Sequence, residues 1–184
     1  MDLKTLEKEN VVLKGHFLLT SGLHSDIYFE KFRLLENPKI LTKLVTSAIK
    51  QMKFRNFDYV VGPVVGGIVV AYEFAKQLKC KAAYLEKRGE KMGFYRGTPI
   101  TKNHRILLVD DVLTTGKSIN EMIEVMCSIN GNIRAIAVLI DRSKETGFDY
   151  PMFKAMTVDT AIYAAESCIL CEKKIPLVRP GGKR

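Results

Sequence analysis

RILLVDDVLTTGKS, residues 105–118, is the stretch of sequence that decides the fold. Its apolar part predicts a buried strand over 105–110. The adjacent carboxylates Asp110 and Asp111 stand where that strand is expected to end. A turn containing Gly116 then leads into a helix predicted over 118–130. A buried strand followed by a turn and a helix is typical of α/β domains with parallel sheets.

The rest of the chain repeats this alternation. Apolar residues at helical spacing predict helices over 38–52 and 67–78. Short apolar runs predict further strands over 58–63, 80–86, 133–141 and 153–159. Residues 87–98 are basic and glycine-punctuated and are predicted to form a long loop or hairpin. We therefore expect an α/β fold with a mostly parallel central sheet flanked by helices, whose ligands bind beyond the carboxyl ends of the strands.

Length and composition restrict the class of protein. The chain has 184 residues, of which 47% are apolar and 27% charged, so it can bury a core and is neither disordered nor fibrous. The longest charge-free stretch, 59–72, is glycine-rich and shorter than the roughly 20 residues that span a bilayer. The N-terminus lacks the apolar core of a signal peptide. We expect a cytoplasmic protein with no membrane partner.

The net charge of +9 predicts an anionic partner, either nucleic acid or a small phosphorylated substrate. Basic residues gather in two segments, 79–96 and 173–184. The four cysteines are too few for a disulfide scaffold and are interpreted as reduced thiols.

The turn after the predicted strand 105–110 carries the chemistry. Residues 114–118, TTGKS, offer backbone N–H groups and hydroxyls at a helix N-terminus, which suits a phosphate. Asp110 and Asp111 would repel a second phosphate but can accept hydrogen bonds from a ribose diol. The combination indicates a ribose 5-phosphate group. A Walker A loop is disfavoured because it requires glycine at Asp111, and an ordinary N-cap with a charged neighbour is the structural alternative.

ILLVDDVLTTGKSI resembles the phosphoribosyl-pyrophosphate (PRPP) loop of the type I phosphoribosyltransferases. Residues 15–31 are similar to the N-terminal hood and base loop of the members that act on orotate. Further similarity covers residues 60–68, which resemble the pyrophosphate-side loop, and 139–143 at the end of a strand. The resemblance implies the type I fold in a single domain, 1–184, with a hood and base-binding region (1–35), a core (36–165) and a basic tail (166–184).

The family reaction transfers ribose 5-phosphate from PRPP to orotate, which gives orotidine 5′-monophosphate and pyrophosphate. The resemblance implies three catalytic residues, Lys91, Asp110 and Asp111. It implies PRPP binding by Lys87, Arg88, Lys91, Asp110, Asp111, Val112, Leu113, Thr114, Thr115, Gly116, Lys117 and Ser118. It implies orotate binding by Tyr28, Phe29, Thr114 and Arg142, where a guanidinium suits a planar anion. An exposed Arg at the end of a strand is otherwise often only solvated.

Residues 87–93 resemble the mobile catalytic loop of the family. In the family this loop closes over the site of a neighbouring subunit, which implies a homodimer with shared sites. Its cations would neutralise the departing pyrophosphate. The alternative is a solvated hairpin, because Glu86 and Glu90 interleave with the cations. Mg²⁺ is the expected cofactor, bound mainly by PRPP oxygens and water and not by a protein cage.

Three positions depart from the family pattern. Thr20 and Gly66 stand where the family usually has lysine, and Gly93 where it often has histidine. They leave open a different base or a non-catalytic role. We therefore keep two alternatives: a PRPP-sensing regulator that binds nucleic acid, and a phosphoribosyltransferase for another nucleobase.

The remaining metal-binding residue types do not predict a metal site. Cys168 and Cys171 form a single C-x-x-C, whereas zinc usually needs four ligands. A dimer could supply a second pair, or Cys80 could contribute, but reduced thiols in a C-terminal turn are the favoured interpretation. His16, His24 and His104 have no metal-binding spacing, and His24 is interpreted as a polar loop residue. We expect no metal held by protein side chains.

Overall fold

The computed structural model describes residues 3–19, 21–97, 100–143 and 147–180. The chain divides into two compact units. The first contains residues 1–34 together with 158–184, and the second contains residues 35–157. Residues 158–165, which the sequence assigned to the core, therefore group with the N-terminal segment, as does the tail.

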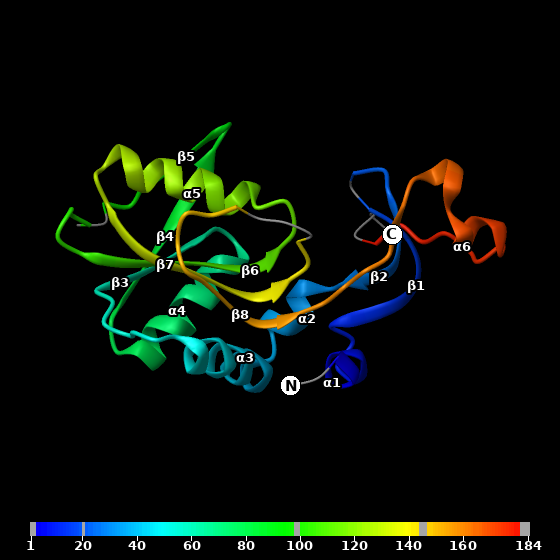
Figure 1. The fold of residues 1–184 in the computed structure, drawn as a ribbon, viewed down its shortest axis with the longest axis horizontal. Coiled ribbons are helices and arrows are strands. Elements are labelled where there is room, and N and C mark those ends of the chain that lie inside the picture. Colours follow the sequence, from blue (N-terminus) through cyan, green and yellow to red (C-terminus); the bar gives the residue numbers. More distant parts are fainter. Residues whose placement is uncertain (1–2, 20, 98–99, 144–146, 181–184) are drawn as a thin grey trace. The chain divides into compact units, whose positions relative to one another are not determined.

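The second unit is built on a six-stranded sheet with the order β5-β4-β3-β6-β7-β8 (Figure 1). Its strands are β3 (Tyr59–Pro63), β4 (Lys81–Arg88), β5 (Lys91–Gly93), β6 (Arg105–Leu113), β7 (Asn132–Asp141) and β8 (Met152–Thr157). All neighbouring pairs are parallel except β4 and β5, which form an antiparallel hairpin. The predicted mostly parallel sheet is confirmed.

Three helices cover the two faces of this sheet. They are α3 (Pro38–Gln51), α4 (Gly66–Leu78) and α5 (Lys117–Ser128). Figure 1 shows α5 on one face and α3 and α4 on the other. The side chains of β6 point alternately to the two faces. Ile106 and Leu108 pack in the core cluster with Met122 of α5, whereas Leu107 and Val109 are buried on the opposite face. Both faces are covered, which explains the unbroken apolar run of this strand.

The chain leaves β3 and β6 in opposite directions across the sheet. The chain continues from β3 to β4 on one side and from β6 to β7 on the other. At their amino ends the two strands are joined by Asp58, whose carboxylate accepts hydrogen bonds from the backbone N–H and the guanidinium of Arg105 at 2.7–2.9 Å. In such sheets the carboxyl ends of this strand pair are where ligands bind.

β6 is longer than the sequence predicted. The strand was expected to end at Asp110, but it continues to Leu113, because Val112 pairs with Ile140 and Leu113 with Asp141 of β7. Its pairing with β3 stops earlier, at Leu108. Asp110 and Asp111 therefore lie inside β6, on a part of the strand that pairs with β7 but not with β3.

The first unit is a small antiparallel sheet with the order β1-β2-β9. Its strands are β1 (Val12–Leu18), β2 (His24–Phe29) and β9 (Ile162–Tyr163), and its helical segments are α1 (Leu3–Lys8), η1 (Ala165–Ser167) and α6 (Ile169–Glu172). The division between the units falls inside α2 (Lys31–Leu35). Val178 closes the unit, because its N–H donates to His16 O and its carbonyl accepts from Leu18 N. The C-terminal segment thus pairs with the N-terminal hairpin.

No helix in the described part of the chain is long and apolar enough to cross a bilayer.

An ion pair between the buried Asp141 and the partly exposed Lys154 stabilises the turn at the end of β7. Asp141 is 3% exposed and accepts hydrogen bonds from Lys154 Nζ at 2.7 Å and from the N–H and hydroxyl of Ser143. Burial alone would raise the pKa of Asp141, but these hydrogen bonds outweigh it and hold the pKa below its ordinary value. The carboxylate therefore stabilises the residues that follow β7.

Replacing Asp141 with Asn should lower the free energy of unfolding by about 1–3 kcal/mol near neutral pH, because the buried amide cannot replace the charged hydrogen bonds. Since the folded pKa is depressed, this stability is present above the unfolded pKa of about 3.9 and is lost as the pH falls through the folded value. Urea unfolding at several pH values measures the free energy of unfolding of both proteins. The difference between wild type and Asp141→Asn should become smaller below about pH 4. Asp149→Asn, at an exposed site, is the matched control.

Candidate active site

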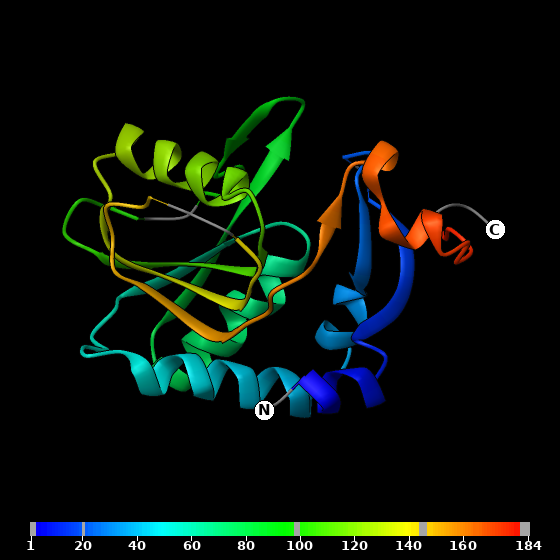
Figure 2. The same cartoon turned by 45° about the vertical axis from the view of Figure 1, so that its right-hand side comes forward.

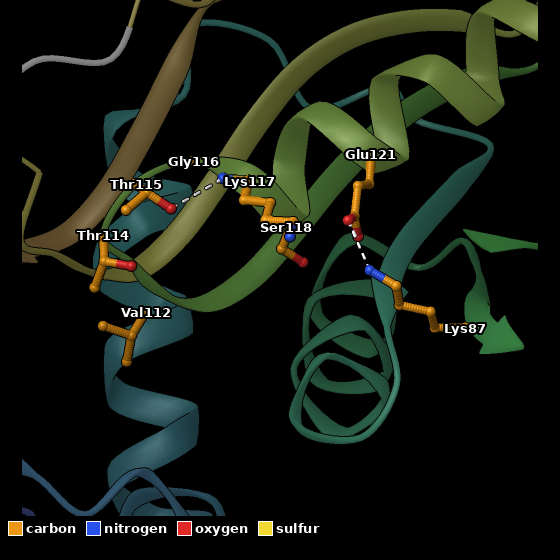
Figure 3. Close-up of a pocket in the computed structure, with 8 residues that line it drawn as sticks. All are labelled: Lys87, Val112, Thr114, Thr115, Gly116, Lys117, Ser118 and Glu121. Atoms are coloured by element: carbon orange, nitrogen blue, oxygen red, sulfur yellow. Dashed lines mark hydrogen bonds and ion pairs between the residues drawn. The ribbon is translucent and has the colours of Figure 1, made fainter. Parts of the chain in front are cut away.

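A pocket of about 360 Å³ lies at the carboxyl end of β6. Figure 3 shows that the turn after β6 and the first turn of α5 form one wall, and that Lys87 reaches in from β4. The lining residues are Lys87, Val112, Thr114, Thr115, Gly116, Lys117, Ser118 and Glu121. Seven of these eight were predicted from the sequence to bind PRPP.

The α5 end of the pocket offers backbone donors. Gly116 caps the helix in the left-handed conformation, with φ +77°, and no side chain caps the helix by a hydrogen bond. The first N–H groups of a helix have no carbonyl acceptor within it and carry partial positive charge. Thr115 Oγ1 accepts only a long bond, 3.4 Å, from Lys117 N. The turn can therefore receive the oxygens of a phosphate.

The opposite side of the pocket carries an ion pair. Lys87 Nζ lies 2.7 Å from Glu121 Oε1 on α5, and the Lys87 side chain is 41% exposed. Glu121 was not anticipated from the sequence. It lies four residues into α5 and so one helical turn from Lys117, a spacing that could have identified it.

Beyond Lys87 the β4–β5 hairpin, whose course is seen in Figure 2, carries the other predicted cations, Arg88 and Lys91. The guanidinium of Arg88 lies 4.1 Å from the ring centroid of Tyr95, and Arg96 Nε donates to Glu86 at 2.8 Å. That bond holds the pKa of Glu86 below its ordinary value. Lys91 is exposed at the start of β5. Arg88 and Lys91 are not among the residues that line the pocket.

Asp110 and Asp111 are buried, at 8% and 4% exposure. One oxygen of each accepts a backbone hydrogen bond, Asp110 Oδ1 from Asp111 N at 2.8 Å and Asp111 Oδ1 from Val112 N at 2.7 Å. Neither lines the pocket, although Val112, which follows them, does. Leu113, predicted to bind PRPP, points into the apolar core beneath α5, so its side chain is structural.

Gly66 explains one departure from the family pattern. A Cβ at Gly66 would collide with Asp111 Oδ2. No side chain fits here while Asp111 keeps its position, so the start of α4 contacts this carboxylate directly through its backbone. At Gly93, in contrast, a Cβ would make only ordinary contacts with the Tyr95 ring, at 3.6 Å. Thr20, the third departure, lies outside the described residues.

Arg142 follows β7 next to the same turn. Its N–H donates to Leu113 O at 2.9 Å, which places its backbone beside the residue that precedes Thr114. The side chain is half-buried. The two core residues predicted to contact orotate, Thr114 and Arg142, are therefore held together by the β6–β7 pairing.

Tyr28 and Phe29 belong to the first unit. Successive strand residues point to opposite faces, so these two rings do not share a face of β2. Phe29 is 6% exposed, whereas Tyr28 is half-buried and its ring lies 5.7 Å from that of Phe17. Burial and the negative charge of Glu30 raise the pKa of Tyr28, so its phenol remains a hydrogen-bond donor.

Comparisons with known proteins agree with this arrangement. The phosphoribosyl transferase domain model matches residues 33–169. Orotate phosphoribosyltransferases of Caldanaerobacter subterraneus subsp. tengcongensis and Thermoanaerobacter sp. are each 37% identical over 183 residues, which is 99% of this chain and 96% of theirs.

Solved structures place the fold in the same group. An orotate phosphoribosyltransferase from Aeropyrum pernix has a TM-score of 0.70 at 27% identity and covers 84% of this chain and 92% of its own. An adenine phosphoribosyltransferase from Thermoanaerobacter pseudethanolicus has a TM-score of 0.61 at 18% identity and covers 72% of this chain and 88% of its own, which is a likeness of fold alone. The chain has the type I phosphoribosyltransferase fold and belongs to the phosphoribosyltransferase family, within its orotate phosphoribosyltransferase branch.

Proposed function

We propose that this protein transfers ribose 5-phosphate from PRPP to orotate and releases orotidine 5′-monophosphate and pyrophosphate. The observation that carries the proposal is the pocket in which Lys87 faces the turn of residues 114–118, directly after Asp110 and Asp111. The names of relatives at 37% identity over almost the whole chain support orotate as the base. We place the reaction in the cytoplasm, as the sequence leads us to expect.

Each part of the site has a role in this reaction. The N–H groups and hydroxyls of residues 114–118 hold the 5′-phosphate. Asp110 and Asp111 accept hydrogen bonds from the ribose hydroxyls and offset positive charge that develops at C1 as pyrophosphate leaves. Arg142 and Thr114 bind orotate so that its deprotonated N1 attacks C1 from the face opposite the leaving group. Tyr28 and Phe29 remain predicted orotate contacts.

The leaving pyrophosphate requires cations. Lys87 already lines the pocket, and Arg88 and Lys91 are carried by the same hairpin. In the proposed reaction Lys87 exchanges Glu121 for a pyrophosphate oxygen, and closure of the hairpin brings Lys91 to the departing group.

Mg²⁺ is part of the proposal. Mg²⁺ is commonly held by substrate phosphates and water with few protein ligands, so PRPP oxygens and water would bind it here. When bound with PRPP it supplies neutralising charge for the pyrophosphate.

A homodimer is also proposed, with residues 87–93 acting at the neighbouring subunit's site. An exposed apolar stripe on α4 supports an interface. Val65, Val69 and Tyr72 are 70%, 42% and 65% exposed, and their spacing puts them on one face of the helix. A second copy of the chain would remove this stripe from water.

The direct test is an assay with Mg²⁺, PRPP and orotate that follows the ultraviolet absorbance of orotate. Uracil, hypoxanthine and adenine are tested in parallel by product chromatography. We expect loss of orotate that depends on both PRPP and Mg²⁺. Tight PRPP binding without turnover of any base would contradict the enzyme and favour the regulator, and turnover of another base alone would contradict the choice of orotate.

Arg142→Ala should raise the KM for orotate about 10- to 100-fold, because a charged hydrogen bond to the base is lost. The KM for PRPP should change much less. Steady-state kinetics with each substrate varied in turn measure both values. Arg134→Ala, which removes an exposed arginine from the same strand, is the matched control. Unchanged orotate kinetics in Arg142→Ala would refute the base-site assignment.

Sharing of sites between subunits can be tested by mixing two inactive variants. Lys91→Ala removes the loop lysine and Asp111→Asn the ribose carboxylate. If the loop acts across the interface, each mixed dimer has one intact site, and an equal mixture regains about a quarter of the wild-type activity. If the loop serves its own subunit, no site is intact and no activity returns. Size-exclusion chromatography with light scattering establishes that the mixed species are dimers.

A further inference from the structure

Four side chains that the proposed reaction does not use meet in the first unit. His16 of β1, His24 of β2, and Cys168 and Cys171 of the C-terminal segment place one potential ligand atom each within 4.8 Å of all the others. The two pairs come from opposite ends of the chain, Cys171 being 147 residues from His24. Figures 1 and 2 both show the C-terminal segment with α6 beside β1.

Three of the distances between these atoms match those of a tetrahedral metal site. Cys168 Sγ lies 3.5 Å from His16 Nε2, and Cys171 Sγ lies 3.8 Å from His16 Nε2 and 3.4 Å from His24 Nδ1. Zn–S bonds of about 2.3 Å and Zn–N bonds of about 2.0–2.1 Å set tetrahedral ligands about 3.3–3.8 Å apart. His16 Nε2 and His24 Nδ1, at 2.8 Å, are closer than this and would separate by about half an ångström.

The tautomer of His16 suits a ligand. Its Nδ1 lies 2.8 Å from the carbonyl oxygen of Ile175 and donates to it, because a carbonyl only accepts. The lone pair of Nε2 then faces the cluster. In metal-binding histidines, the ring nitrogen that does not bind the metal commonly donates its N–H to an acceptor such as a backbone carbonyl.

The backbone also aims these side chains. The β1–β2 register shifts between Lys14 and Phe17, so β1 has one extra residue there. This bulge makes His16 and Phe17 both buried, although a regular strand would turn them to opposite faces. Cys168 caps α6 and Cys171 lies three residues on, which puts both sulfurs on one side of the helix.

The cluster is mostly buried, which distinguishes it from a chance meeting of surface residues. His16, His24 and Cys168 are 2%, 5% and 1% exposed, and Cys171 is the exposed member. His24, which the sequence led us to interpret as a loop residue, lies in a strand. Cys80, considered as a further ligand, belongs to the core unit and is not a member of the cluster.

We propose that His16, His24, Cys168 and Cys171 form a structural zinc site that fastens the C-terminal segment to the N-terminal hairpin. Two thiolates and two imidazoles in tetrahedral geometry select Zn²⁺ among common metals, with iron–sulfur clusters as the main competitor. Four protein ligands leave no open position, which is typical of structural zinc. Binding releases the thiol protons. The proton that His24 Nδ1 donates to His16 Nε2 without metal moves to His24 Nε2, so that both neutral imidazoles offer a lone pair.

The first measurement is the metal content of the full-length protein, purified with a reductant and without chelators, by plasma mass spectrometry. About one zinc per chain is expected. Cys171→Ser, at the exposed ligand, should lose it, whereas Cys127→Ser, at an exposed thiol of the core unit, should keep it. Wild-type protein that takes up no zinc after incubation with Zn²⁺ would overturn the proposal. So would zinc retention in Cys171→Ser, a Cys168–Cys171 disulfide under these conditions, or iron and sulfide in place of zinc.

Two readouts distinguish a ligand from a residue that only supports the fold. Co²⁺ in place of zinc should show intense visible bands of tetrahedral geometry and a thiolate charge-transfer band that weakens in Cys171→Ser. Chelation should increase hydrogen exchange at residues 12–29 and 162–178 and leave 105–141 unchanged. Octahedral cobalt spectra, or exchange that chelation does not alter, would contradict the site.

Discussion

The parallel pairing of β3 with β6 is the constraint on which the site depends. The two strands are held at their amino ends by Asp58 and Arg105 and remain paired only as far as Leu108. From there β6 continues with β7 alone. Asp110 and Asp111 lie in the stretch that has lost one neighbour, the turn of residues 114–118 follows it, and the backbone of Gly66 contacts Asp111. A longer pairing with β3 would place backbone hydrogen bonds on the side of β6 where we propose that the substrate binds.

Much of the core unit could be predicted because its signals are local. Apolar spacing located α3, α4 and α5 to within about two residues, and the apolar runs located five of the strands. The end of β6 could not be predicted in this way. Asp110 and Asp111 are costly to bury, and only the β7 partners of Val112 and Leu113 explain why the strand continues through them.

For the site too, the residues that could be predicted are those with a local sequence signal. Residues 114–118 were predicted because a short motif carries their chemistry, and the structure places them in one pocket with Lys87. Glu121, the contact of Gly66 with Asp111, and the opposite orientations of Tyr28 and Phe29 depend on strand register and helix packing. The cluster of His16, His24, Cys168 and Cys171 lay beyond any local pattern, because its ligands meet only when the two ends of the chain pair.

The composition of the first unit from both chain ends has a consequence for synthesis on the ribosome. Residues 35–157 are contiguous and form one compact unit, so they can fold before the residues that follow them are made. The β1–β2 hairpin is made before residues 35–157, yet β9 and Val178, which complete its edges, are made after them. An isolated two-stranded hairpin is at best marginally stable. The nascent chain therefore carries an incomplete sheet with open edges while residues 35–157 are made, and the native partners of this sheet arrive only after them.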